Sequence, residues 1–118
     1  MDRDNALIAY SVSVALNNVA DLRFNGGDIA GATTLYERSL VIVRSLAAND
    51  PDNVEWARGL AVSLNHAGDV RRSENRADEA LALYAEGLAI ARSVADKDAQ
   101  NLDALRDVTL SLDRVGDL

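Results

Sequence analysis

The chain has no cysteine and a single proline among its 118 residues. The lack of cysteine excludes disulfides and thiolate metal ligands, and it fits a reducing compartment. One proline leaves helices nearly uninterrupted. Aromatic residues make up only 4% of a chain that is 48% hydrophobic, so a core must consist mostly of Ala, Leu, Val and Ile. Because Ala and Leu are strong helix formers, the composition favours one helical domain.

The sequence also lacks long apolar runs and an excess of basic residues. No run approaches the ~18 continuous apolar residues of a membrane span, and the N-terminus Met-Asp-Arg-Asp shows no signal-peptide pattern. Twelve basic residues stand against 19 acidic ones, a net charge of −7. Because phosphate-rich surfaces attract clustered Lys and Arg, we expect no nucleic-acid or membrane partner. We also expect a cytoplasmic location. The acidity serves solubility or a preference for a basic partner.

What the sequence does contain is an internal repeat. Aligning residues 13–60 with residues 61–108 gives 16 identities in 48 positions. Unrelated segments would share about three or four, given ordinary residue frequencies. A fixed period of this size is typical of stacked supersecondary units, none of which can bury its apolar face alone. The units are expected at about residues 4–51 and 52–99, with a partial third at 100–118, in one domain.

The hydrophobic spacing within each unit predicts a pair of helices. Apolar residues recur every three or four positions, as in an amphipathic helix. Asn53 and Asp28 are suited to cap helix N-termini, and Asn75 is suited to a left-handed turn. The five expected helices span residues 4–24, 29–48, 54–73, 77–96 and 102–117. We therefore predict an all-α fold of antiparallel helix hairpins.

The hairpins resemble tetratricopeptide repeats, whose pattern is W-x2-L-G-x2-Y followed by A-x3-F. The matching segments are Leu64-x2-Ala67-Gly68 with Ala80-x3-Tyr84, and Leu16-x2-Val19-Ala20 with Ala32-x3-Tyr36. Leu stands where the pattern has Trp, and each unit is 14 residues longer than the usual 34 (48 − 34 = 14). The resemblance implies a right-handed α-solenoid of about five helices, a lengthened variant of the family. It also implies a scaffold that binds a protein or peptide along a concave groove lined by the first helix of each hairpin.

The resemblance points to specific groove residues. Those that follow the small residue of the pattern, together with those one turn earlier, form a polar stripe of Asn17, Asp21, Asn65, Asp69, Asp113 and Asp117. Family members that clamp a terminal carboxylate typically have Asn, with nearby Lys, where this chain has Asp three times. An anionic stripe would repel a carboxylate, so we expect a basic or amide-rich segment. Alternatively, these Asp residues pair with Arg71, Arg72 or arginines of a neighbouring hairpin, or are simply solvated.

No residue set in the sequence indicates catalysis or a cofactor. His66 is the only histidine, so neither a metal site nor an activated nucleophile can be assembled around it. Gly26 and Gly27 form a turn rather than a phosphate loop, because no strand precedes them and no Lys follows. Trp56 is expected in the core between hairpins, with an exposed binding anchor as the alternative. The chain is therefore predicted to be no enzyme and to need no cofactor.

The sequence ends within the first helix of a third unit. There Leu112, Val115 and Leu118 would ordinarily pack under a following helix. Three explanations are open: a longer array, association of two chains through this end, or a tolerated exposed patch. The leading function is an interaction scaffold, and the alternative is a structural spacer or self-association segment of a larger regulatory or signalling protein.

Overall fold

The structure is a computed structural model that describes residues 3–97, 100 and 102–116. In this part of the chain there are five α-helices and no strands. The helices are α1 (Arg3–Asn25), α2 (Ile29–Asn49), α3 (Val54–Ser73), α4 (Ala77–Lys97) and α5 (Leu102–Gly116). Wherever both bounds are described, they differ from the predicted ones by at most one residue. The predicted all-α fold is confirmed.

Local side-chain chemistry sets the helix boundaries. The Asp28 side chain accepts a hydrogen bond from the Gly31 backbone N–H at 2.9 Å, and Asn53 accepts one from the Trp56 N–H at 3.1 Å. Both are N-caps that satisfy donors which the first turn of a helix leaves free. Gly27 (φ 90°) and Asn75 (φ 61°) provide the left-handed turns that end α1 and α3. These two residues lie 48 positions apart, so the hairpin turn itself is repeated.

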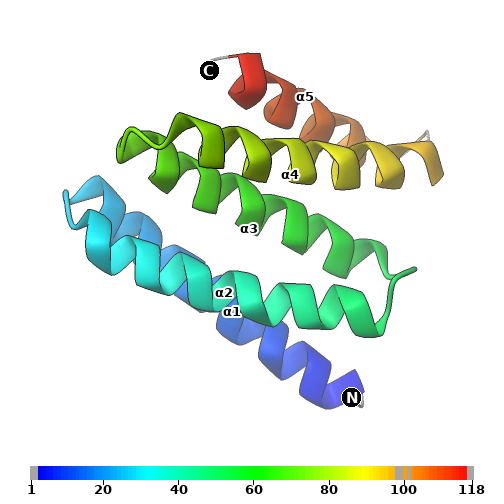
Figure 1. The fold of residues 1–118 in the computed structure, drawn as a ribbon. Coiled ribbons are helices and arrows are strands. Elements are labelled where there is room, and N and C mark those ends of the chain that lie inside the picture. Colours follow the sequence, from blue (N-terminus) through cyan, green and yellow to red (C-terminus); the bar gives the residue numbers. More distant parts are fainter. Residues whose placement is uncertain (1–2, 98–99, 101, 117–118) are drawn as a thin grey trace.

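Each helix packs against the next along the chain, from α1 to α5 (Figure 1). Odd-numbered helices also touch one another, as α3 and α5 do, and α2 reaches α4 through Arg44, which binds Glu86 with two hydrogen bonds of 2.6 and 2.9 Å. The molecule therefore has two layers, one of α1, α3 and α5 and one of α2 and α4. This arrangement brings equivalent positions of the odd-numbered helices side by side.

Small residues allow the two helices of each hairpin to approach closely. A Cβ atom added to Gly68 would lie 2.4 Å from the Cε1 atom of Tyr84, which is fully buried. In the first hairpin the equivalent residues are Ala20 and Tyr36, and both belong to one buried cluster. In each hairpin a tyrosine ring therefore fills the space that a glycine or alanine leaves open.

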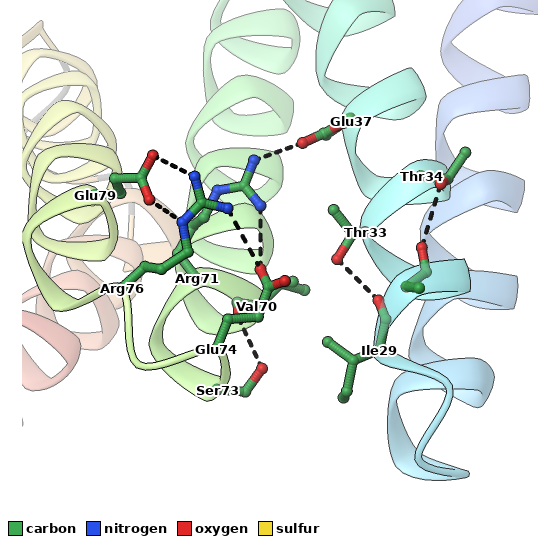
Figure 2. Close-up of polar contacts among 11 residues, drawn as sticks. Ile29, Thr33, Thr34, Glu37, Val70, Arg71, Ser73, Glu74, Arg76 and Glu79 are labelled. Atoms are coloured by element: carbon green, nitrogen blue, oxygen red, sulfur yellow. Dashed lines mark hydrogen bonds and ion pairs between the residues drawn. The ribbon is translucent and has the colours of Figure 1, made fainter.

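Ionic contacts near the hairpin turns join α2 to α3. Arg71 donates to Glu37 on α2 at 2.6 Å and to Glu74 at 3.2 Å, while Arg76 pairs with Glu79 (Figure 2). Arg71 is thus engaged with glutamates. The neighbouring arginine that binds Asp69 comes instead from α5, as described below.

Candidate functional site

Polar contacts between odd-numbered helices recur with the period of the sequence. The Nδ2 atom of Asn17 on α1 donates to the Ser63 Oγ on α3 at 3.5 Å. The Nδ2 atom of Asn65 on α3 donates to the Ser111 Oγ on α5 at 3.3 Å. Donor and acceptor are 46 residues apart in both cases, so the register between α1 and α3 is repeated between α3 and α5.

Asp21 lies at the junction between the first and second units. Its carboxylate accepts a hydrogen bond from the Tyr36 hydroxyl on α2. The Nδ1 atom of His66 on α3 lies 3.7 Å from the same carboxylate. The His66 ring stacks on the Tyr36 ring with centroids 5.1 Å apart and planes 4° apart. Three helices therefore meet at one carboxylate.

Asp69 forms the equivalent junction 48 residues later. Its Oδ1 atom accepts a hydrogen bond from the Tyr84 hydroxyl on α4 at 2.5 Å, and the Arg114 Nε on α5 donates to it at 3.1 Å. Arg114 occupies the repeat position of His66. Asp69 is therefore already paired inside the protein, with the arginine of a neighbouring hairpin.

Burial changes the proton affinities of these groups. Desolvation lowers the pKa of His66, although the nearby Asp21 and Asp69 carboxylates act in the opposite direction. The pKa values of Tyr36 and Tyr84 are raised, first by burial and then by their hydrogen bonds to Asp21 and Asp69. Burial thus favours neutral His66 and neutral hydroxyls that donate to the aspartates.

A cleft of about 320 Å³ opens between α1 and α3, and a smaller one of about 110 Å³ lies between α3 and α5. Val14 and Val62 line the first cleft, and Val62 and Leu110 line the second. These three residues are 41%, 41% and 42% exposed and lie 48 positions apart. They form an apolar row, one residue per odd-numbered helix, which is hereafter called the groove row.

The lining of the larger cleft contains two acidic side chains and one arginine. Asp21 and Glu55 contribute carboxylates to it, and Arg58 contributes the guanidinium. Arg58 Nε is bound to the Asp107 carboxylate on α5 at 2.7 Å. The positive charge is thus already neutralised, while the cleft retains carboxylates.

The residues of the predicted polar stripe differ in how far they are buried. Asn65 is buried between α3 and α5 rather than displayed on an open surface. Asn17 is partly buried and Asp113 is exposed. Asp117 lies outside the described residues. In its first two units the stripe therefore forms contacts between helices, while Asn17 and Asp21 also line the larger cleft and Asn65 lines the smaller one.

The groove row was not among the predicted site residues. A signal was available, because Val14 and Val62 are identical residues at the same repeat phase. They are positioned among polar residues on the side of the helix away from the core. A single apolar residue there does not stand out in a chain that is 48% hydrophobic. Only the side-by-side placement of the odd-numbered helices turns three scattered residues into a row.

Other expectations can be placed in the structure. Trp56 is buried and its ring centroid lies 4.9 Å from that of Tyr10 on α1, which confirms its core position. Leu112 is half exposed and Val115 is partly buried, whereas Leu118 lies outside the described residues. Among the residues that the structure describes, no helix is long and apolar enough to cross a membrane. The same residues include no group of three or more His, Asp or Glu side chains that could hold a metal ion.

A scan against protein-family models finds no match for this chain, and a comparison with curated proteins finds none either. Function must therefore be argued from the surfaces described above.

Proposed function

We propose that this chain is a non-catalytic interaction domain that holds a segment of another protein across α1, α3 and α5, as tetratricopeptide-like scaffolds do. The observation that carries the proposal is the groove row of Val14, Val62 and Leu110. The row lies inside clefts and is bordered by polar side chains, as apolar patches at protein interaction sites often are. The row would contact an apolar side chain of the partner, and the polar side chains around it would orient the partner segment.

The partner segment is expected to be basic or amide-rich with at least one apolar side chain. The apolar side chain would lie against Val62, which lines both clefts. Lysine, arginine or backbone amides would face the carboxylates of Asp21 and Glu55. Complementary charge of this kind raises the association rate and selects partners more than it raises affinity.

A structural spacer remains the second candidate, and one observation favours it. Asp21 and Asp69 bind tyrosines and basic residues of adjacent helices, so these carboxylates stiffen the stack. In that case the odd-numbered helices are joined for rigidity and the groove row has no partner.

The two functions separate in a binding experiment with an array of synthetic peptides of varied charge. We expect the wild-type chain to retain basic peptides that carry an apolar residue. Val62→Glu should abolish retention, and Glu55→Lys should reverse the charge preference. Val41→Glu is the matched control, because Val41 is exposed on α2, in the other layer. Asp69→Lys tests the predicted stripe directly. The spacer would be favoured if the wild-type chain retained no peptide, or if every variant retained the same peptides as the wild type.

A further inference from the structure

None of the described elements covers one apolar face of α1, although the counterpart of this face in α3 is buried. Ile8 is 63% exposed and Leu22 is 74% exposed. Their equivalents 48 residues later, Trp56 and Val70, are only 5% and 1% exposed. Val70 is covered by Ala32 and Tyr36 of α2, and the Trp56 ring packs against the Tyr10 ring of α1. The same side of α1 is left open to solvent.

The residues of this face follow a regular spacing. They are Ile8, Val12, Ala15, Val19 and Leu22, with steps of four, three, four and three residues, and all are exposed. This is the spacing of the apolar positions in helices that pair along their length. We name these five residues the α1 seam.

The α1 seam reads nearly the same in both directions: large, medium, small, medium, large. An antiparallel pair of α1 helices with a two-fold axis at Ala15 would place Ile8 against the partner's Leu22 and Val12 against the partner's Val19. Each Ala15 would meet its own copy, where two small side chains let the backbones approach. The equivalent residues of α3, in the order Trp, Leu, Ser, Ala and Val, have no such symmetry. A self-complementary patch of this kind is what a two-fold dimer requires.

Charge is also absent from this region. Residues 5–20 contain no Asp, Glu, Lys or Arg, although 26% of the chain is charged and about four would be expected in 16 residues. No other uncharged stretch of the sequence is as long. Depletion of charge at the centre of a patch is a compositional mark of protein–protein interfaces.

We propose that the α1 seam is a homodimer interface in which two copies of this chain pair through antiparallel α1 helices. Ala15 follows Val14 by one residue, which corresponds to about 100° around the helix. The α1 seam and the groove row therefore face different directions, and pairing leaves both grooves open. A single helix-to-helix seam is smaller than the roughly 800 Å² per partner of a standard interface. The dimer should accordingly be weak and depend on the concentration of the chain.

The chain has no cysteine, so a single introduced thiol reports pairing without ambiguity. Oxidation of the Ala15→Cys variant at micromolar concentration should give a disulfide-linked dimer, since each Ala15 meets its own copy at the two-fold axis. Val41→Cys, an exposed position on α2, should crosslink at least tenfold more slowly. A crosslinking rate at position 15 no faster than at position 41 would overturn the proposal.

A second measurement uses charge at the same position. By sedimentation velocity, Ala15→Glu and Ala15→Arg should each be monomeric, whereas an equimolar mixture of the two should recover dimers. Because Ala15 is exposed, circular dichroism should show unchanged helix content in both variants. A wild-type chain that stays monomeric at several hundred micromolar contradicts the proposal. So does a dimer that survives Ala15→Glu and dissociates only in the Leu112→Glu, Val115→Glu variant, since pairing would then use α5.

Discussion

The imidazole of His66 lies 3.7 Å from the Asp21 carboxylate, at the repeat position where the Arg114 guanidinium binds Asp69. The two junctions share their geometry and differ in chemistry. Histidine changes its charge between about pH 5 and 8, and burial favours the neutral form of His66. The junction that contains His66 is therefore expected to respond to a fall in pH.

This difference leads to a prediction for stability against pH. Burial lowers the pKa of His66 in the folded state below its usual value near 6.5. As the pH falls below 7.5, the unfolded chain binds a proton before the folded chain does, so the free energy of unfolding must decrease. Urea unfolding midpoints should fall between pH 7.5 and 5.5. His66→Gln should remove most of this decrease, because the chain has no other histidine. An equal decrease in the variant would contradict the assignment.

The second junction should hold α5 in place. Arg114→Gln removes the ionic bond to Asp69. The Arg114 side chain is 29% exposed and the Asp69 side chain is 33% exposed. For a partly exposed pair we expect a loss of about 0.5–1 kcal/mol. Amide hydrogen exchange should accelerate in α5 and remain unchanged in α1 and α2. Arg106→Gln, at an exposed position of the same helix, is the control. Uniform acceleration along the whole chain would show that Arg114 has no such local role.

A third prediction concerns packing inside the second hairpin. Gly68→Ala places a methyl group 2.4 Å from the Cε1 atom of the buried Tyr84 ring. Ring and helix must move apart, which should cost about 1–3 kcal/mol of stability. At Gly116 an added Cβ meets no atom within 4 Å, so Gly116→Ala should be neutral or slightly stabilising. Thermal unfolding of both variants checks the pair, and equal melting temperatures would contradict the packing argument.

Much of the fold was predictable because its signals are local. The helix boundaries follow from apolar spacing together with the capping side chains of Asp28 and Asn53. The left-handed conformation of Asn75 follows from its residue type. Each of these preferences acts within a few residues along the chain, so the neighbouring sequence contains what is needed to predict it.

The candidate site was predictable only in part. The sequence indicated that Asp69 could pair with an arginine of a neighbouring hairpin, and the structure identifies that residue as Arg114. It did not indicate that Asn65 is buried against Ser111 or that Val62 lines two clefts. These facts depend on the rotation and register of α3 relative to α1 and α5. Contacts across about 46 residues are set by packing and not by any local preference.

The sequence by itself determined that this chain is a repeat of helix hairpins, since a 48-residue period requires equivalent units that stack. It also determined where each helix begins and ends, because capping and turn residues act locally. Only the tertiary structure decided which repeated residues form an apolar surface and which form contacts between helices. Asp21 and Asp69 form contacts between helices because tyrosine and basic side chains from adjacent helices reach their carboxylates. Val14, Val62 and Leu110 became a surface because none of the described helices covers that side of α1, α3 and α5.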